Sequence, residues 1–514
     1  MVFDRRLSGI LLHPTSLPGP NGSGDLGAAA YHFVDWLVSA GQSLWQVLPL
    51  MPIGPGNSPY MSVSAFAGNP LLVDLDDLIR RGWLAPIDDD ERAGFEAHRV
   101  DYAKVVPFRL NKLREAAAGF FAQADHAAKD AFNAYCAAES AWLDDYALFM
   151  ALDEHFGGCF WPEWDAPLAR REAAALTQAR KRLAPQIAFW KFVQWCFESQ
   201  WLALKDYANQ RGIQLIGDLP IFVAHHSADC WASPDLYLLD EACWPTVIAG
   251  VPPDFFSATG QRWGNPLYNW AKMEESGYVW WIKRIQRQLA LADIVRIDHF
   301  RGFAAYWEIP AAELTAVNGR WVQGPGKKFF DAIEKALGKL PIIAEDLGII
   351  TPEVVELRDS LDLPGMRVLE FAFADSPNHN FLPHNYIANT VVYTGTHDND
   401  TIVGWWATCT ERERGFARYY LQTDGEEIHW SLIRAAAMSV ARMAIYQFQD
   451  VLGLDGWHRM NLPGKTGYWE WRCSWDYVDA ESGQRLAYLT ALSGRTSADK
   501  LPPLTDWPND RPLP

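Results

Sequence analysis

The feature that most constrains the fold is the recurrence of eight short, apolar, β-prone runs, each followed by sequence with helical spacing. Strands that alternate with helices form parallel sheets, because each crossover helix returns the chain to the same edge. Eight such units predict an α/β fold in which the sheet closes into a (β/α)₈ TIM barrel. The runs cover residues 8–13, 44–49, 213–219, 293–298, 341–346, 366–373, 390–396 and 443–450.

The first connection shows the helical pattern clearly. Ala30, Phe33, Val34 and Leu37 fall on one face of a helix, and Asp25 precedes them as the expected N-cap.

Two connections are too long for simple crossovers and predict insertions into a single catalytic barrel spanning residues 1–514. Residues 76–202, between the second and third strands, contain Ala-rich helical sequence and predict a helical subdomain. Residues 221–270, between the third and fourth strands, are rich in Gly, Pro and aromatic residues and predict a loop-rich insertion over the active-site groove. The Pro-rich residues 501–514 predict an extended closing segment.

Charge and cysteine usage limit the possible partners. The net charge of −18 disfavours nucleic acid and anionic membrane surfaces, and no run of 18 apolar residues predicts a membrane span. The seven cysteines contain no CxxC pair, and the N-terminal apolar run is too short for a signal peptide. We therefore expect a cytoplasmic protein.

The 25 tryptophans allow two interpretations. Exposed indole faces suit sugar rings, whereas buried indoles fill a large core. Composition alone leaves both open.

Three acidic residues stand at the predicted C-terminal ends of strands, where barrel enzymes place catalytic groups: Asp298, Glu345 and Asp398. Cleavage of a glycosidic bond needs a proton for the leaving oxygen and negative charge beneath the oxocarbenium ion, which carboxyl groups supply. Two carboxyl groups roughly 5 to 5.5 Å apart retain the anomeric configuration through a covalent intermediate.

Two neighbours support this interpretation. Arg296 lies two residues before Asp298, so both side chains face the same way along a strand, and the guanidinium favours the ionised carboxylate of a nucleophile. His397 can hydrogen-bond a sugar hydroxyl. The alternatives are an Arg–Asp pair that merely bridges strands and a histidine that bonds nearby backbone.

Other site classes have less support. His225, His226, Asp229 and Cys230 form the best metal candidate, but adjacent histidines point to opposite faces of a strand and no spaced ligand set accompanies them. The sequence lacks a GxxxxGK[ST] loop, a GxGxxG turn directly after a predicted strand and a GxSxG elbow.

The acidic motifs resemble signature segments of the amylomaltases, also called disproportionating enzymes or 4-alpha-glucanotransferases, of the wider α-amylase superfamily. They are RIDHFRG at 296–302, IAEDLG at 343–348 and TGTHDNDT at 394–401. The similarity extends along nearly the whole chain, through residues 12–18, 45–50, 58–60, 64–70, 217–220, 250–254, 261–266 and 459–464.

This resemblance implies a barrel without a C-terminal β-sandwich and without a metal or organic cofactor. It implies Asp298 as nucleophile, Glu345 as general acid and base, and Asp398 as the group that grips hydroxyls of the reacting glucose, with Arg296 and His397 in the same subsite. The implied substrates are α-1,4-glucans: maltooligosaccharides, amylose and glycogen-derived dextrins.

Further substrate contacts follow from the same resemblance. Tyr60 and Asp218 are similar to sugar contacts near the cleaved bond. Asp254, Gln261 and Trp263 lie in a segment similar to the family's mobile loop over the groove.

Two alternative functions remain at this stage. An α-1,4-glucan hydrolase of the same superfamily uses the same three carboxylates, and a non-catalytic glucan-binding protein keeps the aromatic groove without the chemistry.

Overall fold

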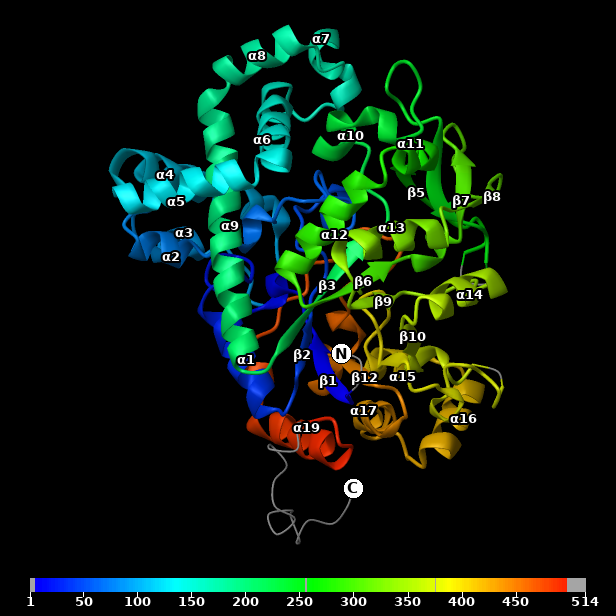
Figure 1. Ribbon diagram of the computed structural model, residues 1–514. Coiled ribbons are helices and arrows are strands. Elements are labelled where there is room, and N and C mark those ends of the chain that lie inside the picture. The colour runs from blue at the N-terminus through cyan, green and yellow to red at the C-terminus, as the bar shows by residue number, and fades with distance from the viewer. Residues whose placement is uncertain (1–4, 255–256, 375, 497–514) are drawn as a thin grey trace.

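The eight predicted strands form one closed, parallel barrel in the computed structural model, which describes residues 5–254, 257–374 and 376–496. The strand order is β1-β12-β11-β10-β9-β6-β3-β2, and the barrel lies at the centre of Figure 1. The predicted TIM barrel is confirmed. Its strands are β1 (Leu7–Leu11), β2 (Leu44–Gln46), β3 (Gln214–Pro220), β6 (Ile294–Asp298), β9 (Ile342–Ala344), β10 (Gly365–Val368), β11 (Thr390–Tyr393) and β12 (Met443–Gln447).

The strands are nearly continuous apolar runs because both of their faces are covered. Every residue of β1, β11 and β12 is buried, as expected where helices cover the outside and side chains fill the interior. Six strands end earlier than predicted: β1, β2, β9, β10, β11 and β12. A 3₁₀ turn, η8 (Leu369–Phe371), follows β10, and helix α18 (Phe448–Val451) follows β12.

The helices that return the chain between strands form the outer ring. The first, α1 (Ala28–Ser39), buries Ala30, Phe33, Val34 and Leu37 as predicted. Its N-cap is Gly27 rather than Asp25, whose carboxylate instead accepts a hydrogen bond from the Gly27 backbone N–H at 3.0 Å. The other helices of the ring are α12 (Val279–Leu291), α13 (Lys327–Leu337), α14 (Pro352–Ser360), α15 (Ile402–Thr408), α16 (Glu411–Leu421), α17 (Ile428–Met438) and α19 (Ala480–Leu492).

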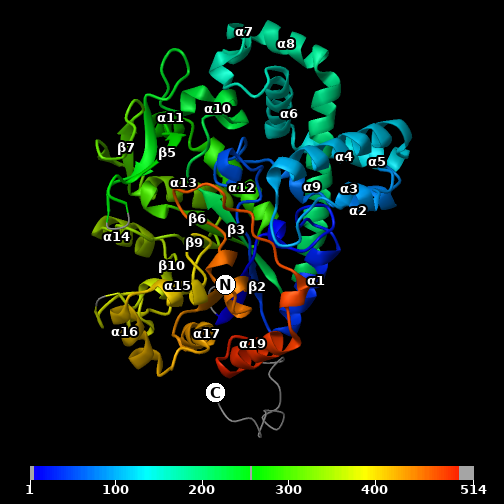
Figure 2. The same cartoon turned by 180° about the vertical axis from the view of Figure 1, so that it is seen from behind.

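The long connection between β2 and β3 is helical, as predicted. Its last helix, α9, continues past residue 202 to Gln210 and packs against α1 and β3, so its C-terminal part belongs to the barrel's outer ring. In Figures 1 and 2, α6 to α8 lie at the opposite end of the molecule from α19. The helices are α2 (Leu75–Arg80), α3 (Asp89–Arg92), α4 (Tyr102–Gln123), α5 (His126–Ala138), α6 (Ser140–His155), α7 (Ala166–Ala169), α8 (Ala173–Arg182) and α9 (Ala184–Gln210).

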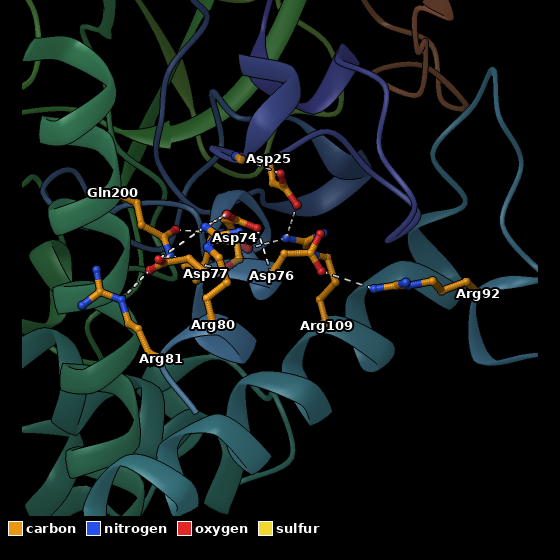
Figure 3. Close-up of polar contacts among 11 residues, drawn as sticks. Asp25, Asp74, Asp76, Asp77, Arg80, Arg81, Arg92, Arg109 and Gln200 are labelled. Carbon is orange, nitrogen blue, oxygen red and sulfur yellow. Dashed lines mark hydrogen bonds and ion pairs between the residues drawn. The ribbon is translucent and has the colours of Figure 1, made fainter. Parts of the chain in front are cut away.

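A network of charged and polar side chains ties these helices to the barrel (Figure 3). Arg109 of α4 is fully buried and donates to Asp25, on the loop before α1, at 3.2 Å. Asp74 caps α2, and its backbone N–H donates to Gln200 of α9 at 2.7 Å. Burial raises the pKa of Asp25 to about 6, and Arg109 opposes this rise.

The connection between β3 and β6 contains more regular structure than predicted. Besides α10 (Ala228–Ala232) and α11 (Trp270–Glu275), it forms strands β4 (Val247–Val251) and β5 (Gln261–Pro266). These pair antiparallel with each other, and β4 pairs with β7 (Ala305–Pro310), which pairs with β8 (Arg320–Gln323). The sequence signal was weak because β5 is an edge strand, with little of it buried.

Most tryptophans fill the core. Trp45, Trp161, Trp201, Trp231 and Trp281 are each less than 2% exposed, and they favour the packing interpretation of the composition. The most exposed in the described chain, Trp321 and Trp457, show 40% and 56% of their surface.

The remaining predictions concern the ends of the chain and its surroundings. After β12, the chain up to residue 496 forms helical segments and irregular structure with no further named strand. The predicted closing segment 501–514 lies outside the described residues. Among the described helices, none is long and apolar enough to cross a bilayer. The seven cysteines, all in described positions, are free thiols.

Replacing Arg109 by Met should lower the free energy of unfolding by about 3–5 kcal/mol, because the buried Asp25 carboxylate loses its charged partner. Equilibrium denaturation in urea measures the change. Arg92→Met is the matched control, since the Arg92–Asp76 pair belongs to the same network but lies at the surface, with side chains 22% and 47% exposed; about 0–1 kcal/mol is expected there. Adding Asp25→Asn to Arg109→Met should recover part of the loss. Equal losses for the Arg109 and Arg92 variants would contradict this account.

Candidate active site

Neighbouring strands bring the predicted acidic residues to one end of the barrel. Asp298 is the last residue of β6, and Glu345 directly follows β9, which pairs with β6. On the other side of β6, β3 pairs in a register that sets Asp218 opposite Arg296. Asp398 lies in the loop after β11, five residues beyond the strand end at Tyr393. This is the end at which barrel enzymes carry their active sites.

Arg296 holds two of the carboxylates. Its Nη1 donates to both oxygens of Asp218 at 2.7 Å, and its Nη2 donates to Oδ1 of Asp298 at 3.0 Å. The Tyr60 hydroxyl donates to Oδ2 of Asp218 at 2.6 Å. The Asp218 side chain is fully buried, whereas that of Asp298 is 28% exposed. Asp298 is therefore the carboxylate of this pair that an incoming molecule can reach.

Burial and crowding of like charges control the ionisation of this pair. Burial raises the pKa of Asp298, Arg296 opposes the rise, and the nearby carboxylates Asp218, Glu345 and Asp398 add to it. Burial lowers the pKa of Arg296, but Asp218 and Asp298 outweigh burial and raise it well above its usual value. Glu345 and Asp398 both act on Asp298, so the three predicted acids lie near one another.

Glu345 has a different environment. Its Oε2 accepts the backbone N–H of His299 at 2.6 Å, and its Oε1 accepts that of Leu347 at 2.7 Å. Burial raises the pKa of Glu345, while Arg296 and these two amides oppose the rise. Each oxygen keeps a second lone pair, so the group can still carry and deliver a proton.

Asp398 is held by the segment that follows the 3₁₀ turn η10 (Gly456–His458). Asn461 Nδ2 donates to Asp398 Oδ1 at 2.6 Å, and Arg459 Nη2 donates to the Asp398 backbone carbonyl at 2.8 Å. The Asp398 side chain is 47% exposed, and Nε2 of His397 lies 3.5 Å from its Oδ1. Burial lowers the pKa of His397, so its ring is neutral at pH 7. Asp398 is thus fixed at one oxygen and open to solvent.

Aromatic rings form one wall of the cluster. Tyr60 stacks on His397 with ring centroids 5.1 Å apart, and Trp469 lies 5.7 Å from both rings. Trp469 has a φ of 70°, a left-handed conformation that bulky residues seldom adopt. Such outliers concentrate at functional sites.

The residues predicted to cover the groove occupy β5 and the preceding loop. Trp263 lies edge-on against His299, with centroids 4.8 Å apart, and donates from Nε1 to Gln261 Oε1 at 3.1 Å. Asp254 Oδ1 accepts the backbone N–H of Ser257 at 2.7 Å. Gln261 and Trp263 therefore lie beside the acidic cluster, and Asp254 organises a turn of its own loop.

The metal candidate of the sequence does not assemble. His225 Nε2 contacts the Cys243 carbonyl at 2.8 Å, whereas His226 Nε2 contacts Asp153 Oδ1 at 2.8 Å. Asp229 instead accepts the Ala65 backbone N–H at 2.7 Å. Within residues 5–254, 257–374 and 376–496, no three His, Cys, Asp or Glu side chains are grouped to hold a metal ion.

Four residues of the site were assigned no role from the sequence: His299, Arg459, Asn461 and Trp469. Arg459 and Asn461 lie within the motif at 459–464, which was noted as a resemblance. Polar side chains in a motif of this kind can donate hydrogen bonds to the acids, and this is the sequence signal that points to Arg459 and Asn461. Trp469 has no comparable signal, because its left-handed backbone is not visible in sequence.

The fold and the site together define a (β/α)₈ barrel with carboxylates gathered at the C-terminal ends of its strands, the arrangement of a barrel enzyme. A family model described as 4-alpha-glucanotransferase matches residues 12–477. The chain belongs to this family.

Individual relatives agree over nearly their whole length. The chain is 51% identical to a 4-alpha-glucanotransferase of Thermus thermophilus, over 95% of this chain and 99% of that protein. It is 46% identical to a chloroplastic/amyloplastic 4-alpha-glucanotransferase of Solanum tuberosum, over 96% and 87%. Among solved structures, an amylomaltase from Streptococcus agalactiae in complex with acarbose matches with a TM-score of 0.92 and 40% identity, covering 96% of this chain and 100% of that one.

Proposed function

We propose that this enzyme transfers segments of α-1,4-glucan to the 4-hydroxyl of an acceptor glucan or glucose by a retaining double displacement. The observation that carries the proposal is the asymmetry between two neighbouring carboxylates. Asp298 contacts Arg296 at 3.0 Å, whereas Glu345 is buried and bonded to backbone amides. Carboxyl groups whose environments differ in this way divide into nucleophile and acid.

Asp298 acts as the nucleophile. The cluster contains four carboxylates around Arg296, so their mutual repulsion disfavours full ionisation, and the direct contact with the guanidinium favours charge on Asp298. Its exposed oxygen attacks C1 of the donor glucose as the glycosidic bond breaks, forming a glycosyl-aspartate.

Glu345 acts first as acid and then as base. Burial favours its protonated form, so it can deliver a proton to the departing 4-oxygen. The resulting carboxylate is stabilised by the His299 and Leu347 amides. It then removes the proton from an acceptor hydroxyl, which attacks C1 and restores the original configuration.

Asp398 and the aromatic wall bind the reacting glucose. The open oxygen of Asp398 accepts sugar hydroxyls, and the neutral His397 ring supplies a further hydrogen bond. Tyr60 donates to Asp218 at 2.6 Å, and Asp218 in turn holds Arg296, which completes this subsite.

Transfer exceeds hydrolysis when a bound acceptor outcompetes water, which requires a covered groove. Trp263 packs beside the cluster, and Gln261 orients its indole. We assign residues 250–266, Asp254 included, to the cover of the acceptor side. The helical insertion 76–202 and the insertion 221–270 then border the groove that takes maltooligosaccharides, amylose or glycogen-derived dextrins. We assign the enzyme to the cytoplasm and to glycogen or maltodextrin metabolism.

Purified protein incubated with maltotriose should yield glucose and a ladder of longer oligomers, with little gain in total reducing ends. Chromatography of the products, combined with a reducing-end assay, measures both quantities. A steady rise in reducing ends would identify a hydrolase instead, and unchanged maltotriose would indicate a non-catalytic glucan-binding protein.

Glu345→Gln should reduce kcat on maltotriose by roughly 10²- to 10⁴-fold, because the leaving oxygen loses its proton donor. α-Maltotriosyl fluoride distinguishes the acid from the nucleophile, since fluoride leaves without a proton. Fluoride release by Glu345→Gln should be much less impaired than its turnover of maltotriose, whereas Asp298→Asn should be inactive on both donors. Unchanged turnover of maltotriose by Glu345→Gln would overturn the assignment.

Asn461→Ala should lower kcat/KM on maltotriose by about 10- to 100-fold, because a hydrogen bond to a charged carboxylate is worth about 1.5–3 kcal/mol. Asn209→Ala is the matched control: Asn209 Nδ2 donates to Asp293 at 2.8 Å, near the opposite ends of the strands. That control should retain activity. An equal loss in both variants would show that the effect is one of general stability.

A further inference from the structure

His299 directly follows the nucleophile and has an uncommon backbone conformation. Its φ of 53° and ψ of 47° place it in the left-handed region. For a residue with a Cβ this region is less favourable than the right-handed one. The surrounding structure must therefore hold His299 in place.

This conformation directs the turn after β6 onto Glu345. The His299 backbone N–H donates to the Glu345 carboxylate at 2.6 Å, and the next amide, of Phe300, donates to the Glu345 backbone carbonyl at 3.1 Å. The turn closes with a hydrogen bond from Gly302 N–H to the His299 carbonyl at 2.9 Å. The amide of His299 thus holds the Glu345 carboxylate, and the next amide holds the Glu345 backbone carbonyl.

The imidazole ring is held by packing. It is 8% exposed and lies edge-on to Trp263 at 4.8 Å and tilted to Phe222 at 6.5 Å. Burial lowers the pKa of His299 to about 3, so the ring is neutral. In the described part of the chain, its Nε2 is buried without a hydrogen-bond partner. A Cβ added at Gly302 would lie 3.3 Å from the ring, so the glycine makes room for it.

We propose that His299 is a positioning residue for Glu345: its left-handed backbone directs its amide onto the Glu345 carboxylate and so sets the acid beside the nucleophile. The proposal rests on the proposed role of Glu345.

The amide of His299 is one of several groups that set the ionisation of Glu345. The charged and titratable groups that act on Glu345 come from β6, from the 3₁₀ turn η7 (Phe300–Phe303), from β11 and from the loop that carries Glu345. They are Arg296, Asp298, Arg301, Asp346 and Tyr393. None of these changes in a variant at 299, so a shift in the pH profile reports the lost amide contact.

The test compares two substitutions at this position. Asn tolerates the left-handed region and should maintain the turn without the ring, whereas the β-branched Val disfavours it. His299→Asn should keep kcat on maltotriose within about threefold of the wild type. His299→Val should lower kcat about 10- to 100-fold, the range expected for a lost hydrogen bond to a charged group.

The pH profile separates positioning from general damage. The amide of His299 lowers the pKa of Glu345, so its loss raises that pKa. Activity requires the protonated acid and falls as pH rises through its pKa. The alkaline limb of kcat/KM for His299→Val should therefore move to higher pH, while that of His299→Asn stays in place. The loss of kcat in His299→Val should also be smaller on α-maltotriosyl fluoride than on maltotriose.

Gln422→Val is the matched control. Gln422 ends α16 with a φ of 54° and a ψ of 50°, nearly the same backbone conformation. This variant should lose stability in denaturation without any shift of the pH profile. Equal kcat and equal alkaline limbs for His299→Val and His299→Asn would overturn the proposal. Failure of the proposed function is distinguishable, since it would appear in the products of the wild-type enzyme.

Discussion

The site depends on one ionic bridge inside the barrel, from Asp218 through Arg296 to Asp298. A carboxylate with no exposed surface, such as Asp218, is stable only when it is paired and hydrogen-bonded, and Arg296 with Tyr60 supplies all three of its contacts. Arg296 keeps its other nitrogen for Asp298. Two acids therefore share one guanidinium: both oxygens of the buried Asp218 accept from Nη1, whereas one oxygen of Asp298 accepts from Nη2. The exposed acid is left with one contact and a free oxygen, which is the arrangement a nucleophile requires.

This bridge follows from the closure of the sheet. Strands β3 and β6 are far apart in sequence, and their parallel register sets Asp218 opposite Arg296 and Pro220 opposite Asp298. A slip of one residue would turn Arg296 away from the interior and leave Asp218 unpaired. The parallel register of β6 against β9 places Ala344 opposite Ile297, so the next residue, Glu345, emerges level with Asp298. The barrel thus determines which acid lies next to the guanidinium and which lies next to backbone amides.

The sequence predicted the barrel strands and the acids at their ends, because strand burial leaves long apolar runs and the acids interrupt them. The runs at 390–396 and 443–450 were too long by three residues, since the chain stays buried after it leaves each of these strands. Strands β4 and β5 were missed because the small sheet they form is only partly buried, and its pairing with β7 depends on residues more than 50 positions away. His299 and Trp469 could not be assigned roles, because their left-handed backbones depend on tertiary packing. The sequence likewise does not reveal that Tyr60 stacks on His397 or that Trp263 lies edge-on to His299.

The two halves of the reaction place opposite demands on Glu345, and its surroundings meet both. As an acid it must hold a proton at neutral pH, which burial favours. As a base it must exist as a carboxylate in the same buried place, and the amides of His299 and Leu347 stabilise that charge without adding a cation. A lysine or arginine in direct contact would lower the pKa too far for the first step, and an apolar pocket alone would raise it too far for the second. Backbone amides lie between these extremes. A side-chain substitution does not remove these amides unless it changes the conformation of the backbone.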